Sequence, residues 1–456
     1  MPRCPLRFFV TPGPLARLLA AFFALAPGDA WADDTRSPAR PDRPNVVIIV
    51  ADDLGWNDVG FHGSEIKTPR LDALARESVV LNQFYVFPTC SPTRAALLTG
   101  RSPSRFRILG PLGLDPSRSL PLETVTLAEV LADAGYATGL AGKWHLGPTF
   151  EFGPRRQGFQ VASGYLHGQI DQYEHHYKNL QPSWFRDESF ANESGHATDL
   201  LARDACDFIE RQRARPFFLY VAFSVPHCPL QEDDRWVRQY DGVIEHPHRR
   251  LFAGMVSHMD DAIGRVVDKL DALGLRERTL VWFTSDNGGQ RDLGQADYGG
   301  KHGPYERLGD NRPLRGWKGE LYEGGIRVPS LVNWRGTLPP RRANEVISAI
   351  DVAPTVADQC GAAMPATPQL DGMNVWPAIA SNERLRERTL FWTTGQQSAV
   401  RAGNWKLVET TKSTQLELFD IAADANEVRD RAATERERVE SLAAKLAALK
   451  TELSKP

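Results

Sequence analysis

The sequence is poor in cysteine and has no strong excess of either charge. Five cysteines in 456 residues are too few for a fold built on disulfide bonds. The formal net charge of −3 gives no indication of a surface that binds nucleic acid. No long internal repeat or low-complexity tract stands out. The remaining features are those of an ordinary globular protein, with 42% apolar residues and enough length for a large core and more than one domain.

The N-terminal 32 residues have the pattern of a secretory signal peptide. Arg3, Arg7 and Arg17 precede or begin the apolar run Leu18–Leu25, and the sequence Ala-Trp-Ala at Ala30–Ala32 offers a small-x-small cleavage site. The apolar run is too short, and too closely flanked by proline and glycine, to span a bilayer comfortably. We therefore expect a periplasmic or secreted protein without a stable membrane span, with an uncleaved anchor as the open alternative.

Two short apolar runs end in acidic residues. Asn45–Val50 leads to Asp52 and Asp53, and Thr279–Thr284 leads to Asp286 and Asn287. Wholly apolar, β-branched runs of this length are typical of strands buried on both faces of a parallel sheet. Ligand sites in open α/β sheets lie at the carboxyl ends of such strands, and carboxylate and amide oxygens select Ca²⁺ or Mg²⁺. A turn followed by a helix N-cap is the alternative, which explains one aspartate more easily than two.

Cys90 precedes a segment with high helix propensity. Pro92 suits a first helical turn, and Ala95–Leu98 favour the helix that follows. Cys90 would then lie at a helix N-terminus, where backbone N–H groups favour an anion, and Arg94 can point to the same place. A buried structural cysteine is the alternative. The three residues between Cys90 and Arg94 do not fit the cysteine phosphatase loop, which has five, and no cysteine protease signature is present.

The rest of the chain alternates between helical and strand patterns in the manner of βαβ units. We expect helices at 122–134, 198–213 and 250–273, strands near 135–140 and 216–223, a helix from 351 to about 360, and then a hairpin within 398–420 followed by a helix at 434–453. The predicted fold class is α/β, with a large mixed, mostly parallel sheet between helices and a small C-terminal antiparallel sheet with a helix. The predicted division is a signal peptide at 1–32, a lead-in at 33–44, a catalytic domain at 45–375 and a C-terminal subdomain at 376–456.

The motifs together resemble those of type I sulfatases of the alkaline phosphatase superfamily, whose cysteine is oxidised after translation to formylglycine. The resemblance rests on Cys-x-Pro-x-Arg followed by Ala-Ala-Leu-Leu-Thr-Gly-Arg, and on the blocks Gly142–Gly147, Pro226–Pro229, Asp286–Gly289 and Pro313–Lys318. It runs from about residue 45 to about residue 333, with all motifs in sequence order. It implies an alkaline-phosphatase-like fold and the hydrolysis of a sulfate ester.

The resemblance also implies a cofactor and a maturation partner. Asp52, Asp53, Asp286 and Asn287, together with the formylglycine at position 90, correspond to the residues that bind one calcium ion in the family. A formylglycine-generating enzyme would have to convert Cys90. Sulfated small molecules or saccharides would be the substrates, and nucleic acid would not be a partner.

The family's remaining site residues correspond to five positions of this sequence. Lys143 and Lys318 would contact the sulfate, and Arg94 would add a third cation. His145 would lie beside the formylglycine and take a proton from its second hydroxyl when sulfate is expelled. His227 would face the leaving group, which either it or Lys318 would protonate.

Within the family the motifs look most like the branch that contains arylsulfatase B, the N-acetylgalactosamine-4-sulfatase. One position departs from that branch, because Gln169 aligns where the branch has a serine that contacts sulfate. The role of Gln169 and the substrate implied by the branch stay open.

Two other functions remain open from the sequence. A phosphodiester or phosphonate monoester hydrolase on the same scaffold would share formylglycine and related metal ligands. A calcium-dependent glycan-binding protein without activity would lack one or more catalytic positions, whereas only Gln169 departs from the pattern.

A stretch rich in aromatic residues and histidines follows the Lys143/His145 block. It contains Tyr165, His167, Tyr173, His175, His176, Tyr177 and Trp184. Such side chains commonly stack on sugar rings, although a plain surface loop fits the composition as well. We expect this stretch to lie beside the sulfate pocket and to favour a sulfated saccharide.

Overall fold

The computed structural model describes residues 43–366, 370–410 and 415–454. The predicted signal peptide and most of the lead-in lie outside the described residues. All of these described residues belong to one compact unit, and contacts within this unit carry the description that follows. The predicted boundary between residues 375 and 376 remains a prediction.

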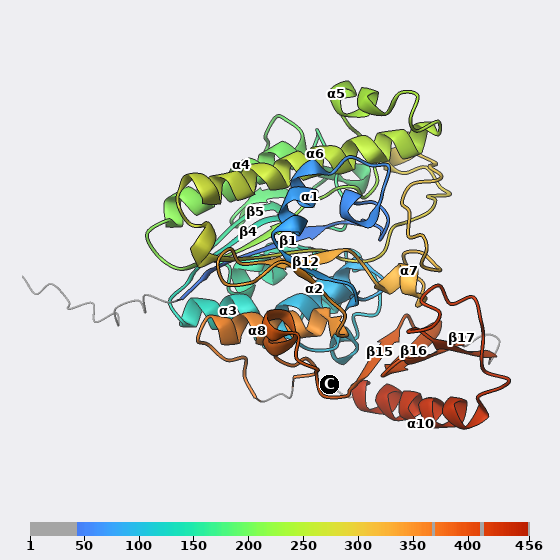
Figure 1. The fold of residues 1–456 in the computed structure, drawn as a ribbon. Coiled ribbons are helices and arrows are strands. Elements are labelled where there is room, and N and C mark those ends of the chain that lie inside the picture. The colour runs from blue at the N-terminus through green and yellow to red at the C-terminus, as the bar shows by residue number, and fades with distance from the viewer. Residues whose placement is uncertain (1–42, 367–369, 411–414, 455–456) are drawn as a thin grey trace, which may run out of the picture. The chain divides into compact units, whose positions relative to one another are not determined.

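A ten-stranded sheet forms the centre of the described chain (Figure 1). Its strands, in spatial order, are β13 (Arg341–Ala343), β2 (Val79–Leu81), β12 (Ser330–Asn333), β11 (Thr279–Ser285), β1 (Asn45–Ala51), β10 (Phe217–Ala222), β4 (Ala137–Lys143), β5 (Val161–Tyr165), β8 (Trp184–Arg186) and β9 (Ser189–Phe190). The run from β11 to β5 is parallel, and β12, β8 and β9 pair antiparallel with their neighbours. The predicted mixed, mostly parallel sheet is confirmed.

Helices cover both faces of this sheet (Figure 1). One layer contains α1 (Pro69–Arg76), α4 (Ala197–Gln212) and α6 (Pro247–Ala272), and the other contains α2 (Cys90–Thr99), α3 (Leu127–Asp133) and α8 (Val352–Gln359). Successive residues of β1 alternate between the two cores: Val46, Ile48 and Val50 face the second layer, and the residues between them face the first. The prediction that this strand is buried on both faces is therefore confirmed.

The predicted helices are present with shifted ends. The helix expected from residue 122 begins only at Leu127, because Thr126 and Glu129 form a capping box that fixes its start. The long helix α6 begins at Pro247, three residues earlier than expected, since proline fits the first turn. Short helices α5 (Asp234–Val237), α7 (Glu323–Ile326) and α9 (Trp376–Ser381) and the two-stranded pairs β3/β14 (Phe84–Tyr85, Ile347–Ser348) and β6/β7 (His176–Tyr177, Gln181–Pro182) complete this part.

The C-terminal part is larger than the predicted hairpin. In the described residues it is a four-stranded antiparallel sheet of β15 (Thr389–Thr393), β16 (Gln397–Ala402), β17 (Trp405–Thr410) and β18 (Gln415–Asp420), with α10 (Arg436–Leu453) packed on it. A separate core holds the two together, in which Val400, Leu407 and Leu418 meet Leu442 and Leu446.

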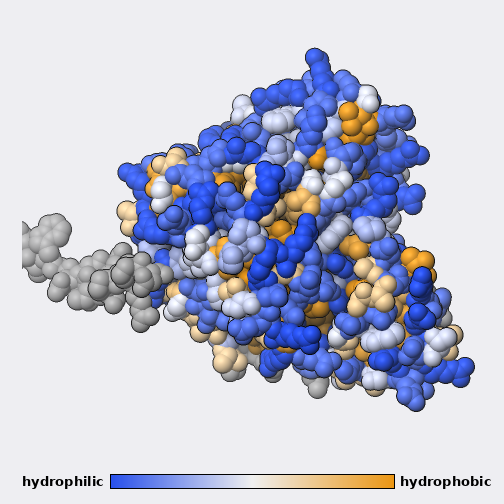
Figure 2. All heavy atoms as spheres, viewed as in Figure 1, coloured by the Kyte–Doolittle hydropathy of each residue, from blue (hydrophilic) through white to orange (hydrophobic). Residues whose placement is uncertain are grey.

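The surface gives no sign of an extended apolar patch on the side drawn in Figure 2, where hydrophobic residues form only small separate areas. No helix within the described ranges is long and apolar enough to cross a membrane.

The central position of β1 leads to a stability prediction. Ile48→Ala should lower the free energy of unfolding by about 2–5 kcal/mol, because the cavity it leaves lies between two packed layers. Val161→Ala, on a side chain that is 38% exposed, serves as the control and should lower it by about 1 kcal/mol or less. Urea unfolding followed by circular dichroism measures both values, and equal losses would contradict the packing described here.

Candidate active site

Four neighbouring parallel strands end at one edge of the sheet and deliver the predicted site residues there. Near the ends of these strands, Val50 of β1 pairs with Ala222 of β10, which pairs with Gly142 of β4, and Ala51 pairs with Ser285 of β11. The residues that follow are, strand by strand, Asp52 and Asp53, Asp286 and Asn287, His227, and Lys143 with His145. Cys90 and Arg94 come from the first turns of α2, and Lys318 comes from the loop before α7.

Each carboxylate of the site is paired with one cation. Lys143 Nζ donates to both oxygens of Asp52 at 2.9 and 2.7 Å. Arg94 donates to Asp286 Oδ2 through Nε at 3.1 Å and Nη2 at 2.7 Å. Lys318 Nζ lies 2.8 Å from Asp53.

The burial of these ion pairs shows which side of the site is open. The side chains of Lys143, Asp52, Arg94 and Asp286 have no exposed surface. Lys318 is 13% exposed and His227 is 12% exposed. A substrate must therefore approach from the side of these last two residues.

The oxygen donors of the site fit a hard divalent cation. Asn287 Nδ2 donates to Asp53 Oδ1 at 2.8 Å, and Asn287 Oδ1 is buried without a hydrogen-bond partner among the described residues. Burial raises the pKa of Asp52 to about 8, an effect that Lys143 opposes and that Asp286 and Asp53 increase. A buried amide oxygen without a donor, next to three mutually repelling carboxylates, is an arrangement that an oxygen-seeking ion such as Ca²⁺ would satisfy.

His145 lies against the side chain at position 90. Its Nδ1 is 3.2 Å from Cys90 Sγ, and its Nε2 is 3.0 Å from the carbonyl oxygen of Leu112. Because a carbonyl only accepts, the proton of the neutral ring is on Nε2, and the lone pair of Nδ1 faces position 90. Ser91 Oγ fixes the backbone here by donating to His145 O and accepting from Leu112 N. Burial also lowers the pKa of His145 well below its ordinary value, which favours the neutral ring.

Gly168 stands behind the ring of His145. A Cβ atom at this position would lie 2.7 Å from His145 Cε1, so only glycine leaves the ring where it is. The next residue, Gln169, donates through Nε2 to Asp297 Oδ2 at 2.8 Å.

His227 occupies the open side of the site. Its Nε2 is 3.7 Å from Asp53 Oδ2, and its Nδ1 donates to the carbonyl oxygen of Cys228 at 2.6 Å. Burial lowers the pKa of His227 to about 3, although Asp53 opposes this effect. All ten predicted site residues are thus joined around position 90, while their individual roles remain predictions.

The stretch rich in aromatic residues and histidines is mostly buried, so only part of it is free to contact a sugar. Tyr165, His167, His175 and Trp184 are buried. His175 stacks on Trp184 with 4.6 Å between ring centroids, and its Nε2 donates to the carbonyl of Gly195. Of the seven residues, Tyr173, His176 and Tyr177 are the ones that keep more than a small accessible surface.

The comparison with known families decides the identity. A family model described as Sulfatase matches residues 44–362, and a second, described as N-sulphoglucosamine sulphohydrolase, C-terminal, matches residues 316–455. The chain belongs to the sulfatase family. It is therefore grouped with the sulfuric ester hydrolases, as its motifs predict.

Individual relatives of this sulfatase agree with the assignment. It is 32% identical to mouse (Mus musculus) arylsulfatase J over 81% of its own length and 65% of the relative's. It is 32% identical to the N-acetylgalactosamine-6-sulfatase of the dog (Canis lupus familiaris), over 90% and 78% of the two lengths. Among solved structures, Ps i-CgsB in complex with k-i-k-neocarrahexaose has a TM-score of 0.81 and 31% identity, and covers 90% of this chain and 93% of that one.

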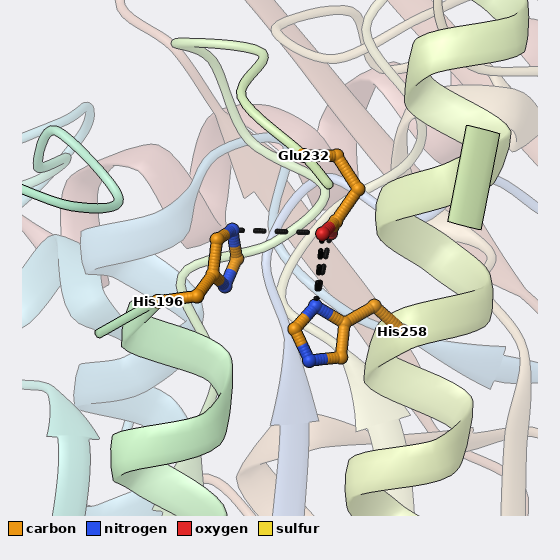
Figure 3. Close-up of side chains that lie close together, drawn as sticks. All are labelled: His196, Glu232 and His258. Carbon is orange, nitrogen blue, oxygen red and sulfur yellow. Dashed lines mark hydrogen bonds and ion pairs between the residues drawn. The ribbon is translucent and has the colours of Figure 1, made fainter. Parts of the chain in front are cut away.

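A second group of potential metal ligands in this sulfatase lies outside the site (Figure 3). It consists of His196 at the start of α4, Glu232 in the loop that carries His227, and His258 in α6. His258 Nδ1 is 3.0 Å from Glu232, and its Nε2 is 3.2 Å from Asp199. Although burial lowers it, these two carboxylates raise the pKa of His258 above its ordinary value, which favours an imidazolium ion.

The hydrogen bonds of His196 argue against a metal at this second group. Its Nδ1 accepts from the backbone N–H of Thr198 at 3.2 Å, and its Nε2 is 3.1 Å from the carbonyl oxygen of Gln231. The ring is therefore neutral with its proton on Nε2, and no lone pair is directed at Glu232. The group joins the His227 loop to α4 and α6 as an ion pair.

Sequence analysis gave no individual role to several residues that shape the site. Gly168, Ser91 and the carbonyl of Leu112 fix His145, and Glu323 lies at the end of the Lys318 loop. Only Glu323 had a visible signal, as part of a Glu-Gly-Gly sequence directly after the Lys318 block. A backbone carbonyl or a missing side chain leaves no such signal.

The unpartnered oxygen of Asn287 leads to a prediction about the metal. If Asn287 is a ligand, Asn287→Leu should weaken Ca²⁺ binding at least about tenfold, because it removes the amide oxygen and keeps the side-chain size. Asn333→Leu is the matched control, since Asn333 is also buried and its Oδ1 also has no hydrogen-bond partner among the described residues, but it lies on β12. Calorimetric titration of chelator-treated protein, with elemental analysis, measures both. Equal affinities of Asn287→Leu and wild type would rule out Asn287 as a ligand.

Proposed function

We propose that this chain hydrolyses sulfate monoesters of saccharides, using a formylglycine made from Cys90 and one bound calcium ion. The observation that carries the proposal is the buried set of three carboxylate–cation pairs around position 90. Asp52, Asp53, Asp286 and Asn287 would hold the ion, together with the group at position 90.

The charge of the site supports an anionic substrate. With all three carboxylates ionised, as a bound cation would favour, the three pairs are neutral together, so a divalent ion would leave the pocket with two positive charges in excess. When bound, such an ion would polarise the sulfate oxygens and make a hydroxyl on the residue at position 90 more acidic. Lys143, Lys318 and Arg94 would then place their N–H groups where negative charge develops.

The surroundings of Cys90 support a modified residue at this position. Burial raises the pKa of the Cys90 thiol, so the unmodified side chain would be a protonated thiol with little nucleophilic character. An aldehyde hydrate would supply a hydroxyl nucleophile, and a second hydroxyl through which sulfate could be expelled. Nδ1 of His145 points at this position with its lone pair and would accept the proton of that second hydroxyl.

The leaving group would lie beside His227 and Lys318. These are the two partly exposed side chains of the site, and both contact Asp53. Burial lowers the pKa of Lys318, but nearby negative charges, chiefly Asp53, more than offset this effect and raise the pKa above its ordinary value, so the Lys318 amine is protonated. We infer that one of these two residues protonates the departing oxygen.

The substrate class rests on the relatives and on the accessible part of the aromatic stretch. One relative is named an N-acetylgalactosamine-6-sulfatase, and a similar solved structure holds a neocarrahexaose. Tyr173, 43% exposed, and the partly exposed His176 and Tyr177 lie in the loop that follows Gly168 and Gln169. We infer that this loop contacts a sulfated saccharide. The N-terminal pattern supports a periplasmic or secreted location.

The first test concerns position 90. In a host with a formylglycine-generating enzyme, the tryptic peptide Glu77–Arg94 should contain an aldehyde in place of the thiol. Cys90→Ser from the same host should lose nearly all turnover, because a simple sulfate ester of serine cannot expel sulfate by this route. Mass spectrometry of active protein measures the conversion, and an unmodified thiol at full activity would refute the mechanism.

The second test concerns the substrate. Sulfated mono- and oligosaccharides, an aryl sulfate, an aryl phosphate diester and an aryl phosphonate monoester should be compared by kcat/KM, and the sulfates should be turned over at least about a hundredfold faster. His176→Ala should lower kcat/KM on the saccharides and leave the aryl sulfate unchanged. His175→Ala, a buried neighbour, is the control for packing and should affect stability and not substrate preference. Preference for the phosphorus esters would favour the alternative hydrolase, and an unchanged saccharide efficiency would exclude the loop.

A further inference from the structure

A buried group of polar and charged side chains connects the C-terminal sheet with the catalytic loops. Lys406 Nζ on β17 lies 3.0 Å from Glu323 Oε1 and 2.9 Å from Glu427 Oε1. Tyr85 Oη donates to Glu323 Oε2 at 2.6 Å, and Arg401 on β16 donates to Tyr85 Oη. These five residues, the buried ion cluster, are each no more than 3% exposed.

Stability alone does not account for the buried ion cluster. Removing charges from water is costly, and apolar side chains of similar volume often give equal or greater stability. Although burial raises it, Lys406 and the nearby arginines lower the pKa of Glu323 to about 2, so this carboxylate is ionised. What an ion pair provides and an apolar contact lacks is a fixed direction, because each hydrogen bond defines where its partner lies.

The buried ion cluster holds the two segments that carry the central residues of the site. Tyr85 precedes Cys90 by five residues, and Glu323 follows Lys318 by five residues. Backbone hydrogen bonds join the same two segments, from Gly319 N to Pro88 O at 2.8 Å and from Val86 N to Ile326 O at 2.8 Å. Together with the contact between Tyr85 and Glu323, these hydrogen bonds form one continuous line of contacts between the two segments, called the seam below.

The metal-site loop is attached to the same seam. Gly288 N donates to Gly325 O at 3.0 Å, and Lys318 N donates to Gly289 O at 3.1 Å. A Cβ atom at Gly288 would lie 1.8 Å from Gly324 O, so the loop after Asn287 approaches α7 as closely as glycine permits. A shift of Glu323 would therefore move both the segment that carries Lys318 and the loop that carries Asn287.

The C-terminal sheet reaches the seam at further points. Trp392 Nε1 on β15 donates to Val86 O at 2.9 Å. Arg315, three residues before Lys318, lies 3.2 Å from Glu417 on β18, and Tyr322 also donates to that carboxylate. All four strands of the C-terminal sheet thus contact the segments around Cys90 or Lys318.

We propose that Glu323 and Lys406 are positioning residues. Through them, the C-terminal sheet sets the distance between Lys318 and the side chain at position 90. The proposal rests on the proposed function, because it assigns Lys318 and position 90 to the reaction. Lys406 acts through its carboxylate partners Glu323 and Glu427 and touches no residue of the proposed site directly. The C-terminal subdomain is then a part of the catalytic apparatus.

The test replaces the charges without changing size. Lys406→Met and Glu323→Gln should lower kcat on an aryl sulfate by about ten- to hundredfold, since a misplacement of about 1 Å has that effect, with KM changed less than about threefold. Arg388→Met is the matched control, because Arg388 pairs with Asp351 between the same two parts of the chain but contacts neither loop. It should keep wild-type kcat. Rates are expressed per formylglycine, measured by mass spectrometry in each variant.

A double variant separates positioning from stability. Lys406→Met with Glu427→Gln removes one charge of each sign, so it should regain most of the melting temperature that Lys406→Met loses. Its kcat should stay low, because Glu323 still lacks the contact with Lys406 that ties it to β17. Recovery of kcat together with melting temperature would overturn the proposal and leave the buried ion cluster a purely structural feature.

Hydrogen exchange provides a readout that does not depend on activity. In Lys406→Met, amides in residues 84–90 and 315–322 should exchange faster than in wild type, while the exchange rates of β4 should not change. In Arg388→Met, the exchange rates of these two loops and of β4 should match those of wild type. Unchanged exchange in the two loops would overturn the proposal. If fully converted wild type turned over no sulfate ester, the proposed function would fail, and the exchange data alone would decide the positioning role.

Discussion

The site depends on one constraint: three carboxylates are buried side by side, and each must have its own cation. Lys143, Arg94 and Lys318 meet this requirement from a strand end, a helix and a loop, which brings three distant segments to the same point. Burial makes the arrangement strict, because a charge without a partner in this environment is very unfavourable. The order of β11, β1, β10 and β4 is what makes the pairing possible, since parallel neighbours end at the same edge.

The positions of the acidic site residues could be predicted from the sequence, because strand ends are local features. The apolar runs before Asp52 and Asp286 are visible in the sequence, and their placement at one edge follows from parallel pairing. Which cation pairs with which carboxylate could not be predicted in this way. The motifs indicate two separate sets, metal ligands and sulfate-binding cations, whereas the structure pairs them one to one. That pairing depends on side-chain reach across three elements.

The errors have a common physical cause, which is that composition does not tell which way a side chain faces. Trp184 and His175 have side chains suited to binding a sugar, yet both are buried and stack on each other. Likewise Leu122–Val125 have helical character, but Thr126 and Glu129 start the helix later because their hydrogen bonds satisfy its first N–H groups. The contribution of the C-terminal sheet to the Lys318 loop depends on contacts between residues about 80 to 110 apart in sequence, such as Glu323 with Lys406 and Glu427, which no local pattern reports.

The burial of position 90 has a consequence for how active molecules arise. Cys90 is 2% exposed and is the first residue of α2, covered by the packed segments that make the site. An enzyme that converts this side chain to the proposed formylglycine would have access only while the chain is still unfolded. Folding and modification would then compete, and a molecule that folded first would stay in an unmodified, inactive form. The active fraction of a preparation would then be set by relative rates during synthesis, and conditions that slow folding would raise it.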